Sequence, residues 1–327
     1  MLTKNDENKF DNFYQSIPNK KNIIYMFFTT NLLHYSINST KLIPEDVNFV
    51  IISSGLTKEE EEVIEQQIKR PYCNLTETYN DVVIWNLLIL KSQENFGWID
   101  VDCFIFNPML FYEIQRFAND KIAINTLWAR KYEHYYIDMH FANTFFQFIN
   151  IKIAKKMLEA HKNMTMLPVV FNINDDNKSR IGYRQYECLD KEQLDYIREY
   201  YPDIDKNFPG YDTTHYYQIL LHIHGYKIHR IRDLDQLAVY YSEEAIHLGG
   251  CHRIHQYKLQ QTLDKIYFRF NMRYSFYLLL KYLPILPDTY TKLYDEFCEN
   301  LALNGINRDP DDIRRKIVSY ANRHLIS

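Results

Sequence analysis

Two aspartates one residue apart, Asp100 and Asp102, interrupt an apolar stretch with the sequence GWIDVDCFIFNP. A buried carboxylate costs free energy unless it is paired with an opposite charge or bound to a cation. Two neighbouring carboxylates are worse, because their negative charges repel each other. Either the strand ends here and both aspartates face water, or a positive charge lies between them.

Where a strand ends and the chain turns, two such carboxylates can reach one cation. Mg²⁺ and Mn²⁺ prefer hard oxygen ligands and are typically held by carboxylates together with substrate phosphates. The bound cation neutralises charge on a leaving diphosphate. This chemistry needs no glycine-rich phosphate loop, and the sequence contains neither GxGxxG nor GxxxxGK followed by Ser or Thr. The alternative is an exposed junction between strand and loop, since a short DxD pattern also arises by chance.

A second polar segment, AIHLGGCHRIHQY, lies far downstream. His247 ends a short apolar run, and its imidazole could supply a third protein ligand to the cation. Gly249 and Gly250 follow, and glycines let the backbone approach a ligand closely. His252 and Arg253 could contact phosphate oxygens, Arg253 through a bidentate fork. The alternatives are an ordinary core or surface histidine, or a zinc site of unusual spacing formed by His247, Cys251, His252 and His255.

The first half of the sequence alternates between strand and helix patterns. The apolar runs 22–28 and 48–55 predict buried strands. The stretch TKEEEEVIEQQIKR predicts a solvated helix with Thr57 as its N-cap. The strongly apolar run 79–93 predicts a helix that is buried against a sheet. Further along, the patterns predict another helix and then another strand, at 108–120 and 121–128.

This alternation predicts an α/β fold with a mixed, mostly parallel sheet. In such sheets, ligands bind outside the carboxyl ends of the strands. Polar residues follow three predicted strands and would therefore gather at one edge of the sheet: Thr29, Thr30 and Asn31; Ser53 and Ser54; Asp100 and Asp102.

The second half is less regular. A strand leading into a helix is predicted within 141–161, and a helix at 191–201. A helix, Gly225 as its C-cap and a following strand are predicted within 210–231. A short strand then ends at the Gly-Gly pair. From about residue 261 the pattern turns helical, which divides the chain into a compact α/β domain, 1–260, and a helical C-terminal extension, 261–327.

Composition and charge narrow the class of protein. The 327 residues are 46% hydrophobic and 24% charged, a balance that can bury a full core. The net charge of -4 argues against a nucleic-acid binder driven by overall charge. The 5 cysteines form no CxxC pair, which favours a reducing compartment. The polar N-terminus and the lack of a run of about 18 to 20 apolar residues favour a cytoplasmic location.

The segments resemble those of the GT-A class of nucleotide-sugar glycosyltransferases. GWIDVDCFIFNP resembles the DxD segment of that class. HLGGCH resembles the His-x-x-Gly segment that supplies a metal ligand and a diphosphate contact in glycogenin-like and galactosyltransferase-like members. FANTFFQFIN resembles the Asn-Ser/Thr stretch around the donor sugar, and FPGYDTTHYYQILLHIHGYKI resembles an acidic-residue helix before a GYKI-type strand. The resemblance covers roughly residues 20 to 258.

The resemblance implies one GT-A, Rossmann-like catalytic domain. It implies that Asp100, Asp102 and His247 hold Mn²⁺ or Mg²⁺. It also implies that the β-phosphate of the donor binds near Gly250 and His252. The nucleotide base and ribose would then lie near the residues at the first two strand ends, Thr29, Thr30, Asn31 and Ser53.

Two further residues receive roles from the resemblance. Asn143 would contact the donor sugar, and Asp212 would be the general base that deprotonates an acceptor hydroxyl. The alternative for Asp212 is the N-cap of the helix that begins in DTTHYYQILL, and one residue can serve as both. With Asp212 as base the reaction should invert, whereas retention is expected if no carboxylate lies near the anomeric carbon.

The predicted activity is metal-dependent transfer of a hexosyl or N-acetylhexosaminyl group from a UDP-sugar to a hydroxyl, on a glycan or another acceptor. One alternative is an inactive protein of the same fold that binds a nucleotide-sugar or a partner. The other is a HAD-type phosphatase, which also carries DxD at a strand end but has Thr where this chain has Phe104.

The C-terminal extension mixes aromatic residues with Lys265, Arg269, Arg273 and Lys281. A basic, aromatic amphipathic helix can lie on a membrane surface, here the inner face. The alternative is a helix that packs on the catalytic domain or on a second copy in a homodimer.

Overall fold

The computed structural model describes residues 2–30, 32–127, 129–131, 140–167, 169, 189–204, 212–232 and 244–247. The predicted helical extension, 261–327, and the predicted boundary near residue 260 lie outside these residues. Within the described part of the chain, no helix is long and apolar enough to cross a membrane.

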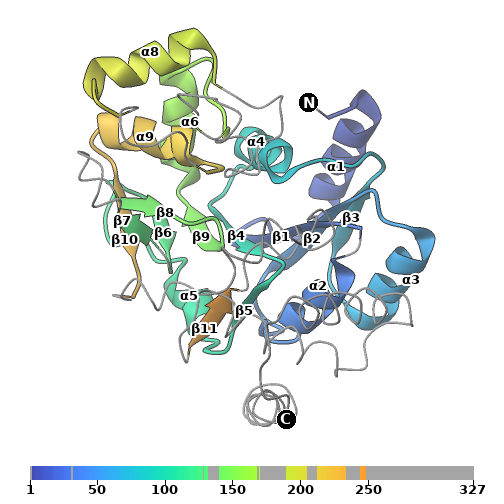
Figure 1. Cartoon of the computed structure of the whole chain (residues 1–327). Coiled ribbons are helices and arrows are strands. Elements are labelled where there is room, and N and C mark those ends of the chain that lie inside the picture. Colours follow the sequence, from blue (N-terminus) through green and yellow to red (C-terminus); the bar gives the residue numbers. More distant parts are fainter. Residues whose placement is uncertain are drawn as a thin grey trace, which may run out of the picture.

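A mixed, mostly parallel sheet forms the centre of the structure (Figure 1). It has 7 strands in the spatial order β10-β6-β9-β4-β1-β2-β3. Strand β9 runs antiparallel to its neighbours β4 and β6, and the other pairs are parallel. The predicted α/β fold class is therefore confirmed. The strands are β1 Ile23–Thr29, β2 Phe49–Ser54, β3 Tyr72–Leu75, β4 Phe96–Asp100, β6 Ile122–Thr126, β9 Phe146–Ile149 and β10 Lys227–Arg230.

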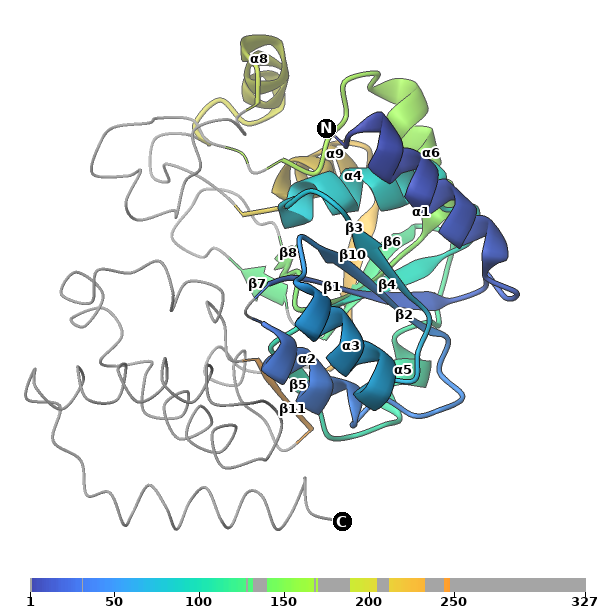
Figure 2. The ribbon, with the colours of Figure 1, turned by 90° about the vertical axis from the view of Figure 1, so that its right-hand side faces the viewer.

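Helices cover both faces of the sheet (Figures 1 and 2). One face carries α1 Lys4–Ser16, α4 Asp81–Lys91, α6 Ile151–Ala160 and α9 His215–Ile223, and α8 Lys191–Tyr200 packs on α9. The other carries α2 Leu33–Thr40, α3 Lys58–Gln67 and α5 Leu110–Glu113. Each face has its own apolar core, and the stacked rings of Trp85 and Trp98 join α4 to β4 with centroids 4.5 Å apart.

Two short antiparallel pairs stand apart from the main sheet. Strand β5, Cys103–Ile105, pairs with β11, Ala245–His247, and β7, Ala129–Lys131, pairs with β8, His140–Ala142. The first pair matters for the site, because β11 comes from the far end of the described chain and lies beside the segment that follows β4.

Local sequence accounts for much of this arrangement. Strands β1 and β2 are buried almost throughout, as their continuous apolar runs predict. Thr57 caps α3 as predicted, and its hydroxyl accepts from the Glu60 backbone while the Glu60 carboxylate accepts from the Thr57 backbone. Helix α4 is apolar nearly all round because it lies between the sheet and its neighbouring helices.

The helix predicted across 108–120 is wrong in length, because α5 has only 4 residues. The Asn125 side chain donates hydrogen bonds to the carbonyl oxygens of Ile114, at 2.9 Å, and Arg116, at 2.9 Å. These carbonyls are thus satisfied by a strand residue instead of a continuing helix. Helices α1 and α2 and the edge strand β3 were not expected from the sequence.

The close packing of Gly97 in β4 gives a test of the sheet. A Cβ atom there would lie 2.8 Å from Cδ2 of Phe148 and 3.0 Å from Cγ1 of Ile24. We expect Gly97→Ala to lower the free energy of unfolding by about 1–3 kcal/mol, since overpacking a core forces its neighbours to shift. Urea unfolding measures the change, with the exposed Glu94→Ala as control. Equal unfolding midpoints for the two variants would contradict this packing.

Candidate functional site

The two aspartates lie where the chain turns at the carboxyl end of β4. Asp100 is the last residue of that strand, the next two residues form a turn, and β5 begins at Cys103. Asp102 is buried, with 5% of its surface exposed, whereas Asp100 is partly exposed. Because the chain turns here, both carboxylates can approach the same point in space.

His247 completes this group from the other end of the chain. It ends β11 and is paired with Cys103 in the antiparallel register of β5 and β11. Its Nε2 lies 3.1 Å from Oδ1 of Asp102 and 3.5 Å from Oδ2 of Asp100. One ligand atom from each of the three residues lies within 4.8 Å of the other two. The residues that the sequence singles out as metal ligands are therefore brought together.

Neighbouring groups orient Asp100 and His247. Nε1 of Trp98 donates to Oδ1 of Asp100 at 2.7 Å, which leaves Oδ2 facing His247. The Asp100 backbone N–H donates to the carbonyl oxygen of Phe145 at 2.8 Å. The Phe145 ring in turn stacks on the His247 imidazole. Hydrogen bonds and stacking of this kind fix the orientation of a metal ligand before the metal binds.

The electrostatics of the group fit a divalent cation. Burial alone would lower the pKa of His247, but the carboxylates of Asp102 and Asp100 raise it above its ordinary value. Burial, and then the charges of the same two carboxylates, raise the pKa of the Cys103 thiol well above its ordinary value. The two carboxylates offer the oxygen ligands that Mn²⁺ and Mg²⁺ prefer, and the imidazole adds a nitrogen that transition metals accept.

A third acid, Asp81, lies near this group and was not singled out from the sequence. It is the first residue of α4. Burial raises its pKa to about 6, and the negative charges of Asp212 and Asp100 add to the rise, while a hydrogen bond with Thr213 opposes it. The sequence held a signal for this residue, because a helix that follows a parallel strand begins at the carboxyl edge of the sheet.

Asp212 is exposed, and it is near enough for its charge to raise the pKa of Asp81. Its Oδ1 accepts from the backbone N–H of Thr213 at 2.8 Å, and its own backbone N–H donates to Nδ1 of His215 at 2.7 Å. The N-cap interpretation of Asp212 is wrong, because Thr214, in a left-handed conformation with φ 70°, holds the N-cap position of α9. Asp212 is therefore an exposed acid that does not cap the helix.

The other residues predicted to contact the nucleotide-sugar differ in their burial and in their hydrogen-bond partners. The hydroxyl of Thr30 donates to Glu60 at 2.7 Å, and the fully buried hydroxyl of Ser53 donates to Asn74 at 3.2 Å. Both hydroxyls thus serve the fold at the predicted sheet edge. Two other residues are partly exposed, at the end of β1 and between β8 and β9, namely Thr29 and Asn143. Three predicted contacts lie outside the described residues, namely Asn31, Gly250 and His252.

Comparison with known proteins points to glycosyl transfer. Residues 2–154 match the family model of the StrH glycosyltransferase N-terminal domain. Within one stretch of 97 residues, 29% of this chain, the sequence is 35% identical to the dTDP-dihydrostreptose--streptidine-6-phosphate dihydrostreptosyltransferase of Streptomyces griseus. The match spans 25% of that relative's length. The two matches support a glycosyltransferase in general terms.

The fold has a low similarity to solved structures of two kinds of enzyme. The glycosyltransferase GlyE of Streptococcus pneumoniae TIGR4 matches at 12% identity over 77% of this chain and 64% of its own, with a TM-score of 0.31. A cytidylyltransferase from Leptospira borgpetersenii serovar Hardjo-bovis matches at 12% identity over 58% of this chain and 98% of its own, with a TM-score of 0.28. Scores this low carry no argument, so the fold class rests on the sheet itself.

The raised pKa of Asp81 has a consequence for stability. Its carboxyl has an ordinary value of 3.8 and a folded-state pKa of about 6, so between these values the native state binds more protons than the unfolded state. Ionising Asp81 therefore costs stability, fully above pH 6 and not at all well below pH 4. We expect Asp81→Asn to stabilise the metal-free protein at pH 7.5 by on the order of 1 kcal/mol.

Thermal unfolding in EDTA between pH 4 and pH 8 measures this effect. The gain from Asp81→Asn should shrink as the pH falls through about 6, and the exposed Asp120→Asn should show no such trend. A constant difference in stability between Asp81→Asn and the wild type at every pH would mean that folding does not raise the pKa of Asp81.

Proposed function

We propose that this protein is a metal-dependent glycosyltransferase that moves a sugar from a nucleotide-sugar donor to an acceptor hydroxyl. The observation that carries the proposal is the convergence of Asp100, Asp102 and His247 at the carboxyl edge of a mostly parallel sheet. Ligands bind at this edge in open α/β sheets. The match to a glycosyltransferase domain over residues 2–154 includes both aspartates and supports the same class of reaction.

The three residues have a shared task in this proposal. They would hold Mn²⁺ or Mg²⁺, which when bound neutralises charge on the leaving diphosphate. Trp98 and Phe145 keep the ligands oriented through their contacts with Asp100 and His247. The glycines and histidine after β11 would contact the diphosphate itself, in line with the roles expected for Gly250 and His252.

Two acids are available to deprotonate the acceptor. Asp212 is exposed and therefore accessible to an acceptor hydroxyl, which makes it the first choice for general base. Asp81 has a pKa of about 6, close to the working pH that suits a general base. Asp81 could equally accept hydrogen bonds from hydroxyls of the donor sugar, since it is near enough to Asp100 for that charge to raise its pKa. Either acid acting as base from the face opposite the leaving group would give inversion.

The donor is a pyrimidine nucleotide-sugar in this proposal. A UDP-linked hexose or N-acetylhexosamine follows from the resemblance to the GT-A class. The Streptomyces griseus relative is named for a dTDP-linked sugar, so dTDP-sugars belong in the same test. The acceptor is a hydroxyl on a glycan or on a smaller molecule. The predicted cytoplasmic location, peripheral membrane contact and homodimer remain predictions, and the last two depend on the helical extension 261–327.

The donor test needs no acceptor. With Mn²⁺ present, we expect slow hydrolysis of at least one sugar in a panel of UDP- and dTDP-sugars, measured as release of the nucleoside diphosphate. Asp100→Asn and Asp102→Asn should each lower this rate by roughly 100-fold or more, because each removes one proposed ligand of the cation and one of the negative charges that hold it.

Asp120→Asn, an exposed aspartate outside the site, is the matched control and should hydrolyse the donor at the wild-type rate. Metal-independent hydrolysis, or full turnover in both ligand variants, would contradict the proposal. Mn²⁺-dependent binding of UDP or dTDP without hydrolysis or transfer would instead favour the nucleotide-sugar-binding protein.

Once an acceptor is known, the base can be identified by substitution. We expect Asp212→Asn to lower kcat by about 100-fold or more while leaving donor hydrolysis, which uses water, less affected. Transfer rates measured from pH 5 to pH 8 for Asp212→Asn and Asp81→Asn separate the two acids. Full turnover in Asp212→Asn, together with loss of the acid limb of the pH profile in Asp81→Asn, would assign the base to Asp81.

A further inference from the structure

The strand that carries His247 is too short to hold its own position. Strand β11 has only 3 residues, and the pair that it forms with β5 is marginal without further anchoring. A metal ligand must nevertheless be held within a few tenths of an ångström of its working position. Some other contact must therefore fix β11, and the contacts around Glu244, the residue immediately before it, supply one.

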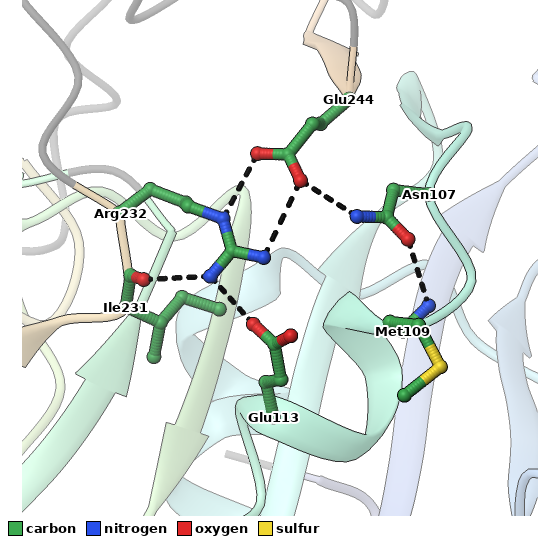
Figure 3. A network of polar contacts seen from close by, with 6 residues as sticks. All are labelled: Asn107, Met109, Glu113, Ile231, Arg232 and Glu244. Atoms are coloured by element: carbon green, nitrogen blue, oxygen red, sulfur yellow. Dashed lines mark hydrogen bonds and ion pairs between the residues drawn. The ribbon is translucent and has the colours of Figure 1, made fainter.

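Glu244 is tied to the segment that follows β5 through both its backbone and its side chain (Figure 3). Its carbonyl oxygen accepts from the backbone N–H groups of Phe106, at 2.8 Å, and Asn107, at 3.1 Å. Its Oε1 accepts from the Asn107 side chain at 2.6 Å. Oδ1 of Asn107 in turn accepts from the backbone N–H of Met109 at 3.1 Å, just before α5.

Arg232 closes the network from the end of β10. Its Nε donates to Oε2 of Glu244 at 2.9 Å and its Nη2 to Oε1 at 3.3 Å, a bidentate pair (Figure 3). Its Nη1 lies 2.5 Å from Oε2 of Glu113 in α5 and donates to the Ile231 carbonyl oxygen at 2.9 Å. One guanidinium thus joins β10, α5 and the start of β11.

The charges in this network are matched and partly shielded. The side chains of Arg232 and Glu244 are 29% and 31% exposed. Burial alone would raise the pKa of Glu244, but hydrogen bonds from Arg232 and Asn107 lower it, so the carboxylate stays ionised near neutral pH. All three guanidinium nitrogens of Arg232 have protein partners, so the side chain holds neighbouring segments together.

We propose that Arg232 is a positioning residue for the metal centre, holding β11 through Glu244 so that His247 faces Asp100 and Asp102. Glu244 and His247 are three positions apart on an extended strand, about 10 Å at about 3.3 Å per residue. Because only the 3-residue strand β11 follows Glu244 and its pair with β5 is marginal, a shift at Glu244 can carry over to the imidazole. The inference rests on the proposed function, since it takes the three residues to be metal ligands.

The test measures Mn²⁺ binding to the full chain by the electron paramagnetic resonance signal of free Mn²⁺, alone and with UDP or dTDP. Arg232→Met should weaken binding by about 10- to 100-fold, the usual effect of removing a group that orients a metal ligand. Arg232→Lys keeps the charge but not the bidentate pair and should show a smaller loss. If Arg232→Met does not fold, the Mn²⁺ affinity of Arg232→Lys decides instead: weaker binding supports the inference, and wild-type binding overturns it.

Lys91→Met is the matched control. Lys91 also pairs with two acids, Glu7 at 2.9 Å and Asp11 at 2.8 Å, and is 28% exposed, but it lies at the opposite end of α4 from Asp81. Thermal unfolding should show that both Met variants lose stability, while only Arg232→Met loses Mn²⁺ affinity. Wild-type affinity in Arg232→Met, or an equal loss in Lys91→Met, would overturn the inference. A wild-type chain that binds no Mn²⁺ with either nucleotide would overturn the proposed function as well.

Discussion

Repulsion between two carboxylates beside a buried imidazole is the constraint around which the site is built. A positive charge between Asp100 and Asp102 relieves this repulsion, and the need is greatest at Asp102, which is buried. The two carboxylates raise the pKa of His247 for the same reason, because a proton on the imidazole offsets part of their negative charge. A divalent cation offsets it more completely, since it brings two charges and accepts the oxygen and nitrogen lone pairs directly.

The sheet topology decides where this charge can gather. Parallel β1 and β4 place Phe27 opposite Asp100, so both strands end at one edge. The helix that follows β3 must start at that edge as well, which brings Asp81 toward Asp100. A fold that collects three acids at one edge lowers its own stability there. Such a cost is common at sites that bind charged ligands, because the ligand later removes the repulsion.

The sequence predicted the elements whose signals are local. Continuous apolar runs predicted β1 and β2, and the Thr57 capping box predicted the start of α3. The length of α5 could not be predicted, because it depends on Asn125, which reaches it from a later strand. The alternative of Asp212 as the N-cap of α9 is wrong, because Asp212 and Thr214 both suit a cap and only the backbone conformation distinguishes them.

The site itself was predictable as a set of residues but not as a geometry. Spacing alone indicated that Asp100 and Asp102 could act together, whereas their approach to His247 depends on β11 returning to pair with β5. The region that matches a glycosyltransferase domain, residues 2–154, contains both aspartates but not the histidine. Within that region the two carboxylates would face each other without a compensating group. His247, the proposed third ligand, and Asp212 come from later segments, so the charge balance of the site depends on residues beyond the matched region.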